Sequence, residues 1–322
     1  MSGNRNVAVY FSLSRPDEIA APLEILENRF AALFEIRRLF WPRFENLADP
    51  EKFDQGIAGF IENILLENFR MFLELAQGWS GGPVRVAHRK TAASHVLLDA
   101  KFLSGIDTLV VISFDSLRTQ QQASSDEIAA VAEFLKDTNH RAFICPHHDI
   151  GNVDGVPADQ WLSRQESEFH HHGDPAIPAQ QRFGGFALSL LHGLGLQVRN
   201  RYGLHPAKSG DGEPAPLEVF PRADRLSLLN RVATFNLHPH LPHFEISGES
   251  RDKIEVLARQ EIDLGAPAHP FVQAGNRAFN ALLQTTKDFS AGPLLVCDAT
   301  TWSSTAGGLE SLQAFWKNAV LR

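Results

Sequence analysis

Two short segments of the chain gather side chains that can bind a metal ion. The candidate ligands are His147, His148 and Asp149 in the first segment, and His238, His240 and His243 in the second. Imidazole nitrogens and carboxylate oxygens suit divalent ions such as Zn²⁺ and Fe²⁺. Prolines on both sides of His240 restrict the backbone that carries these rings. We therefore predict that the second segment folds back onto the first, so that both segments hold one divalent ion, Zn or Fe.

The spacing of these residues matches no strong zinc signature, because the chain has neither His-Glu-x-x-His nor Cys-x-x-Cys. Two other interpretations therefore stay open. The histidines can cap turns and bond to loop carbonyls, or they can act without a metal as general acids and bases or as anion ligands. A solvated role is favoured for the three consecutive histidines His170, His171 and His172. His269 lies in a proline-flanked turn and is a weaker candidate for the same site.

Four residues are candidates for a part in catalysis. They are His147, Asp149, Asp298 and Cys145. Asp298 could accept a hydrogen bond from a ligating imidazole, as carboxylates next to metal ligands do, or simply cap a turn. Cys145 could be a nucleophile, but the next residue is Pro146, which has no N–H to stabilise an oxyanion. Free cysteine is usually a small buried residue, and a structural role is therefore favoured.

These residues follow short apolar runs that are typical of strands. The expected strands cover residues 7–11, 84–87, 108–114, 141–145 and 293–297. Parallel strands end together at one edge of a sheet, where ligands of open α/β folds bind. Ser12, Asp115, Cys145, His147 and Asp298 should therefore lie along one edge of a central sheet. Arg15, Arg89 and Lys90 also follow strands and could hold an anionic substrate, although exposed surface is the favoured role for each.

Helical patterns alternate with these strands. Apolar side chains recur at helical spacing through a helical insertion at about 16–78. Ser124 predicts the start of a capped helix, and helices are also expected over 179–194 and 308–320, with residues 280–284 ending another. Residues from about 150 to 178 form a predicted His-rich loop. Alternation of this kind predicts an α/β fold with a doubly wound, mostly parallel sheet, built as one elaborated domain over 1–322.

Composition limits the classes of function. The chain has 322 residues, of which 43% are hydrophobic and 21% are charged, and a net charge of -8. An acidic chain lacks the basic face that nucleic acid requires. We see no apolar run of about 20 residues that would predict a membrane helix. The two cysteines cannot build a disulfide framework, and a cytoplasmic location is expected.

Two stretches resemble a known superfamily. GIDTLVVISFDSLRTQQQASSDEIAAVAEFLKDTNHRAFICPHHDIG is similar to the central part of the class I glutamine amidotransferase-like fold, which is flavodoxin-like in its sheet. GPLLVCDATTWSS and GGLESLQAFWKNAV resemble the last strand and helix of its non-amidotransferase members, including ThuA-like proteins. The resemblance covers residues 105–151 and 292–320. It implies that Cys145 occupies the position of the amidotransferase nucleophile. In that family the nucleophile lies in a glycine-rich turn, and Pro146 is a departure from that pattern.

Three functions remain from these observations. The first is a metal-dependent enzyme, a hydrolase of a small molecule, with a His/Asp-ligated divalent ion; a non-haem iron enzyme is its variant. The second is an amidase or transferase that depends on Cys145. The third is a non-catalytic ligand-binding protein of the same fold. No nucleic-acid or membrane partner is expected, and the apolar N-terminal helices could form a homo-oligomer contact.

Overall fold

The computed structural model describes residues 5–13, 56–91, 94–172 and 181–321. Its main sheet has eight strands in the order β2-β1-β3-β4-β12-β11-β10-β8. Their bounds are β1 Val7–Ser12, β2 Arg85–His88, β3 Thr108–Ser113, β4 Arg141–Pro146, β8 Glu218–Val219, β10 Ile254–Glu261, β11 Ala278–Thr285 and β12 Leu294–Cys297. The run from β2 to β12 is parallel, and the remaining three strands extend it in antiparallel pairs. The predicted α/β class with a mostly parallel sheet is confirmed.

The antiparallel extension was not predicted. Residues 280–284 were expected at the end of a helix, and this was wrong, because they belong to strand β11. A short apolar run does not distinguish a buried strand from a buried helix. Here β11 is paired on both sides, with β12 and with β10, and this pairing decides its structure.

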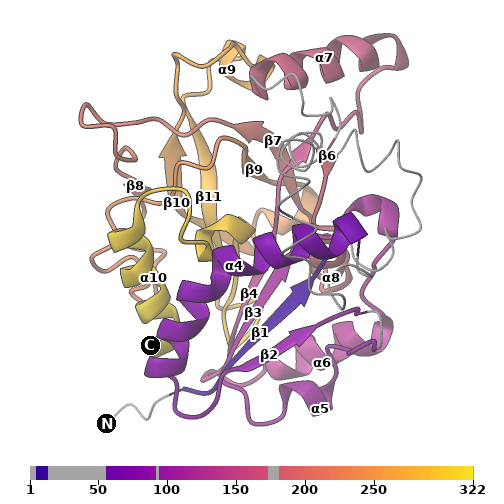
Figure 1. Cartoon of the computed structure of the whole chain (residues 1–322), viewed down its shortest axis with the longest axis vertical. Helices are drawn as coiled ribbons and strands as arrows, with labels where there is room; N and C mark the ends of the chain where they lie inside the picture. The colour runs from indigo at the N-terminus through magenta and orange to yellow at the C-terminus, as the bar shows by residue number, and fades with distance from the viewer. Residues whose placement is uncertain (1–4, 14–55, 92–93, 173–180, 322) are drawn as a thin grey trace, which may run out of the picture.

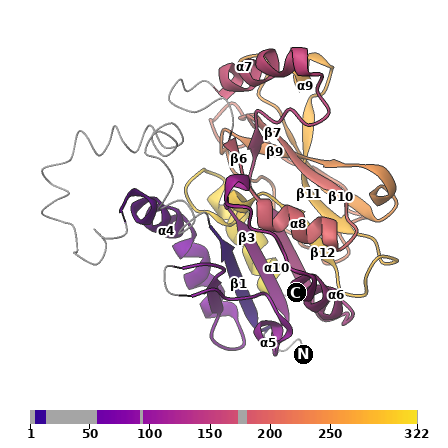
Figure 2. The same cartoon turned by 90° about the vertical axis from the view of Figure 1, so that its right-hand side faces the viewer.

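Helices cover both faces of the main sheet. Helix α4 (Gly56–Trp79) and helix α10 (Leu309–Leu321) contribute to the apolar core on one face. Helices α5 (Ala100–Leu103), α6 (Ser125–Phe134) and α8 (Gly185–Gly193) contribute to the core on the other. Figures 1 and 2 show α4 and α6 on opposite sides of the sheet. Strand residues alternate between the two cores, as in Val110 and Val111. None of the helices in the described ranges is both long and apolar enough to cross a bilayer.

A second, smaller sheet lies beyond the carboxyl ends of the parallel strands (Figure 1). Its order is β6-β5-β7-β9, and its pairs are antiparallel. The strands are β5 Asp149–Ile150, β6 Gln181–Arg182, β7 Val198–Leu204 and β9 Leu241–Ile246. Strand β5 follows β4 after two residues, so that the chain passes directly from one sheet to the other. Both predicted histidine segments lie at this junction.

The predicted helix start at Ser124 is confirmed. The Ser124 hydroxyl accepts a hydrogen bond from the Glu127 backbone N–H at 3.3 Å, and the Glu127 carboxylate accepts one from the Ser124 N–H at 2.9 Å. Glu127 also receives the guanidinium of Arg89, whose side chain is 5% exposed. The expectation that Arg89 is a surface residue was wrong. Its strand end is covered by α6 and α8, and its charge is paired with a buried carboxylate.

The predicted loop near 150–178 contains helix α7 (Trp161–His172), so that His170, His171 and His172 end a helix. The buried carboxylate of Glu168 anchors α7, because it contacts the Arg164 guanidinium and lies 2.9 Å from Nε2 of His269. His269 caps the short helix α9 (Pro270–Gln273), where its Nδ1 accepts the Phe271 N–H. The buried contacts of Glu168 stabilise a helix in this segment, although its polar composition predicted a loop. The remaining short helical turns are Leu117–Thr119, Ala158–Gln160, Gly248–Ser250 and Ala299–Trp302.

Candidate metal centre

The carboxyl ends of the parallel strands meet at one edge of the main sheet, as predicted. Ser12 ends β1, Asp115 follows β3, His147 follows β4 and Asp298 follows β12. Because β4 and β12 are paired in parallel, the residues after them are neighbours. Nδ1 of His147 lies 3.0 Å from Oδ2 of Asp298, although 151 positions separate them in the sequence.

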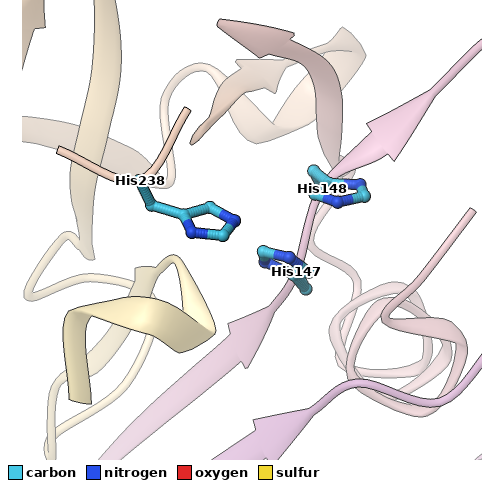
Figure 3. A group of neighbouring side chains, drawn as sticks. All are labelled: His147, His148 and His238. Atoms are coloured by element: carbon cyan, nitrogen blue, oxygen red, sulfur yellow. The ribbon is translucent and has the colours of Figure 1, made fainter. Parts of the chain in front are cut away.

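Three histidines converge at this edge. One ligand nitrogen from each of His147, His148 and His238 lies within 4.8 Å of the others, in a group that could hold a metal ion. Figure 3 shows the three rings facing a common space, with His147 and His148 approaching from one side and His238 from the other. His147 and His148 are buried, and His238 is half-buried. The prediction that the second segment folds back onto the first is confirmed for His238.

The junction of the two sheets explains why two consecutive histidines share one site. Consecutive side chains of a regular strand point to opposite faces, but β4 ends at Pro146 and β5 begins at Asp149. The His147 N–H donates to Ser113 O at 3.2 Å. The buried Asn200 amide on β7 donates to the His147 carbonyl. The turn is therefore held from both sheets.

The backbone at position 184 lies so close to Pro146 that only glycine fits there. Gly184 has a φ of 84°, and a Cβ atom there would lie 2.6 Å from the Cβ of Pro146. Any other residue would push the segment after β6 away from the end of β4. Gly184 also donates its N–H to Asp115 O at 2.9 Å, which ties the loop after β3 to the same place.

The carboxylate of Asp298 sets the orientation of the His147 ring. Burial opposes ionisation of Asp298, but the neighbouring His147 imidazole and a hydrogen bond from Thr300 hold its pKa below the usual value. The carboxylate is therefore ionised and accepts the proton on His147 Nδ1. The lone pair of His147 is then on Nε2, which is the arrangement that carboxylate partners of metal-bound histidines impose.

His240 stands next to the triad. Its Nδ1 lies 3.1 Å from Nε2 of His238, and its ring centroid lies 5.3 Å from that of His148. Two neutral imidazoles can share one hydrogen bond at this separation. Two nitrogens of one tetrahedral ion with bonds of about 2.0–2.1 Å would be a similar distance apart. His240 is thus placed to support His238 or to join it.

The other two predicted ligands, Asp149 and His243, also lie outside the triad and bond to other partners. Asp149 accepts hydrogen bonds from Arg182 at 2.9 Å and from Asn152 at 2.8 Å, and burial raises its pKa to about 6 although Arg182 opposes that shift. Nδ1 of His243 accepts the Asn280 N–H at 3.2 Å, and burial lowers the pKa of its imidazole to about 4. Arg182 could not be paired with Asp149 from the sequence, because 33 residues separate them.

Two other residues of the sheet edge serve the framework. The Asp115 carboxylate accepts the Ser113 hydroxyl at 2.5 Å and the Phe186 N–H at 2.9 Å, so that it caps helix α8. Complete burial raises its pKa to about 6. Ser12 donates its hydroxyl to Gln121 at 3.1 Å. Arg15 lies outside the described residues, and Lys90 forms an isolated backbone bridge with His95.

Cys145 lies inside strand β4, two residues before His147, and is fully buried. Its Sγ is 3.6 Å from Sγ of Cys297 on β12 and accepts a hydrogen bond from the Trp302 indole at 3.1 Å. Burial raises the pKa of the thiol well above its usual value. A buried protonated thiol is a poor nucleophile, and this geometry supports a structural role.

We expect Cys145→Ser to bind metal and to turn over substrate nearly as well as the wild type, with a loss of stability of about 1–3 kcal/mol from burying a hydroxyl. Metal content, hydrolysis of p-nitrophenyl esters and thermal unfolding measure these effects. In the native wild type, iodoacetamide should leave Cys145 unmodified. Rapid alkylation of Cys145, or complete loss of turnover in a folded, metal-loaded Cys145→Ser, would restore the nucleophile interpretation.

Aromatic rings pack against two histidines of the triad. The ring centroid of Phe114 lies 4.4 Å from that of His147, and the ring centroid of Phe183 lies 5.2 Å from that of His148. Such apolar walls lower the local dielectric and strengthen the field of a bound ion. Sequence reasoning missed Asn200 and Phe183. Phe183 lies in the stretch 179–194 that was expected to be helical, but residues 181–182 form strand β6 and helix α8 begins only at Gly185.

Comparison of the chain with protein-family models, curated proteins and solved structures finds no match. The fold and the site therefore define the class: a mixed α/β protein with a mostly parallel sheet and a histidine cluster that could hold a metal ion. The resemblance to the class I glutamine amidotransferase-like superfamily stays a prediction.

Proposed function

We propose that this protein is a metal-dependent hydrolase of a small molecule, in which His147, His148 and His238 bind one divalent ion. A single observation carries the proposal: three imidazole nitrogens from two distant segments lie within 4.8 Å of one another, and an ionised carboxylate orients one of these rings. Clustered imidazoles that are largely removed from water are costly unless they pair or coordinate. A shared cation satisfies all three at once.

The arrangement favours Zn²⁺ over the iron variant. Non-haem iron enzymes commonly use two histidines and one carboxylate. Here the two nearby carboxylates have other partners, Arg182 and Asn152 for Asp149, and His147 and Thr300 for Asp298. Three neutral ligands would preserve the full positive charge of a bound ion, and catalytic zinc sites likewise use three protein ligands.

The chemistry that follows is hydrolytic. A divalent ion held by His147, His148 and His238 would lower the pKa of a water molecule and polarise a carbonyl or phosphoryl group. Asp298 keeps the His147 ring in the correct tautomer, and the rings of Phe114 and Phe183 restrict water around the histidines. His240, which contacts His238, is the nearest further group that could bond to a substrate.

The strand order of the main sheet supports a ligand site at the position of the triad. The parallel strands follow the order β2-β1-β3-β4-β12, which corresponds to the 2-1-3-4-5 order of flavodoxin-like folds. We infer a flavodoxin-like, glutamine amidotransferase-like fold of the non-amidotransferase, ThuA-like branch. In such sheets ligands bind beyond the carboxyl ends of the strands, which is where the triad lies.

The test uses protein purified without a histidine tag. Elemental analysis should find about one zinc per chain, and dialysis against a chelator should abolish hydrolysis of p-nitrophenyl acetate or phosphate, with recovery on adding Zn²⁺. Iron at this stoichiometry would favour the non-haem iron variant. If the protein contains no metal and does not bind added Zn²⁺ or Fe²⁺, the proposal is refuted. A non-catalytic ligand-binding protein would then be the favoured function.

A further inference from the structure

A buried chain of hydrogen bonds joins the two segments that carry the candidate metal ligands. At one end, Oδ1 of Asn236 accepts the His238 backbone N–H at 3.0 Å. Nδ2 of the same amide donates to Oγ1 of Thr300 at 3.2 Å. Asn236 therefore links the His238 segment to the turn that follows β12.

The chain continues from Thr300 to His147. The Thr300 hydroxyl donates to Oδ1 of Asp298, and the Thr300 backbone N–H donates to the same oxygen at 2.8 Å. The second oxygen of Asp298 accepts the proton of His147 Nδ1 at 3.0 Å. Each group has one role in this sequence, because the hydroxyl has a single proton, which it gives to Asp298, and a lone pair that receives the Asn236 amide.

This polarity also fixes the orientation of the Asn236 amide. A flipped amide would place its NH₂ group against the His238 N–H, donor against donor, and its oxygen against a hydroxyl that has already given its proton away. Asn236, Thr300 and Asp298 are 1%, 6% and 4% exposed, so water cannot easily replace a lost bond. The backbone carbonyl of Asn236 accepts a hydrogen bond from the side-chain amide of Gln260 on β10 at 3.1 Å, which anchors this hydrogen-bond chain to the main sheet.

We infer that Asn236 and Thr300 are positioning residues that set the separation of His147 and His238 and thereby the affinity for the metal. This inference rests on the proposed function. Neither residue is placed to coordinate the ion; both act through Asp298 and the His238 backbone. Removing an outer partner of a metal-bound histidine typically weakens binding by about 10–100-fold.

The experiment measures the affinity of the metal-free protein for Zn²⁺ by competition with a chromophoric chelator. Thr300→Val removes the hydroxyl but keeps the shape and the N–H bond to Asp298, and Asn236→Ala removes the amide. Both should bind Zn²⁺ about 10–100-fold more weakly than the wild type. Thr300→Ser, which retains a hydroxyl, should bind within a factor of about three of the wild type.

A matched control separates this effect from general loss of stability. Asn318 is another buried amide, which donates to Leu228 O at 2.9 Å and Asn230 O at 2.8 Å. Asn318→Ala should lower the unfolding temperature and leave the Zn²⁺ affinity unchanged. The visible absorption of Co²⁺ in the site gives a second measurement, because altered ligand geometry changes its bands. It should change in Thr300→Val and remain unchanged in Asn318→Ala.

The outcomes are distinct. If the wild type binds Zn²⁺ and the folded Thr300→Val binds it equally tightly with unchanged Co²⁺ absorption, the positioning role is overturned while the metal site stands. If the wild type binds no metal, the proposed function fails and this inference fails with it. If Asn236→Ala does not fold, the result for Thr300→Val decides the question, because this variant keeps the backbone N–H that donates to Asp298.

Discussion

Replacing His147 by alanine should remove high-affinity metal binding. The substitution deletes one of three ligands and leaves the buried carboxylate of Asp298 without the imidazole that lies 3.0 Å away. Loss of a hydrogen-bond partner of a metal ligand weakens binding by about 10–100-fold, and loss of the ligand itself should weaken Zn²⁺ binding further. Hydrolysis should fall to the uncatalysed rate. Elemental analysis and chelator competition measure the binding.

A second variant separates metal loss from unfolding. His238→Ala removes a ligand from the other segment and leaves the pair of His147 and Asp298 intact. It should lose metal to a similar extent with a smaller change in unfolding temperature. His192→Ala is the control, because this exposed histidine on α8 lies outside the triad and its imidazole bonds to Val198 O. Full metal content in both ligand variants would show that the triad does not hold the ion.

Replacing Glu127 by alanine should cause the largest loss of stability. Its carboxylate contacts the Arg89 guanidinium, accepts the N–H groups of Leu98 and Ser124 at 2.9 Å each, and is fully buried. Breaking a buried pair by removing one partner costs about 3–5 kcal/mol, because the other charge stays buried without compensation. The free energy of unfolding from urea titration measures this effect.

An exposed residue on the same helix provides the control. Glu133 pairs with Lys136 at the surface, with its side chain 72% exposed, and Glu133→Ala should change stability by less than about 1 kcal/mol. Equal losses for Glu127→Ala and Glu133→Ala would contradict the importance of burial.

The cost of losing the Glu127 charge should also depend on pH. Burial opposes ionisation of Glu127, but the bond from Arg89 and the backbone donors hold its pKa below the usual 4.5. The folded state thus binds the proton less readily than the unfolded state. The stabilisation is fully present above about pH 4.5 and is lost as the pH falls through the folded-state pKa. The difference between the wild type and Glu127→Gln should therefore be largest near pH 7 and should narrow in acid. A constant difference would exclude the ionised carboxylate as its source.

The sequence predicted the general fold and the location of the candidate site because both depend on local pattern. Apolar runs followed by polar residues predicted parallel strands, and parallel strands end at one edge whatever their order. This was sufficient to place Ser12, Asp115, His147 and Asp298 together. It also predicted the capped start of α6, since the cap and its partner are three residues apart.

Only the tertiary structure decided which of the clustered groups converge. His147 and Asp298 are separated by 151 positions and meet because β4 and β12 pair. Asp149 was an equally good candidate in sequence, but the second sheet brings Arg182 to its carboxylate. Arg89 could not be recognised as buried until α6 and α8 covered it. Residue type and local spacing determine what a side chain can do, whereas its partner is determined by sheet pairing between distant segments, which local spacing does not encode.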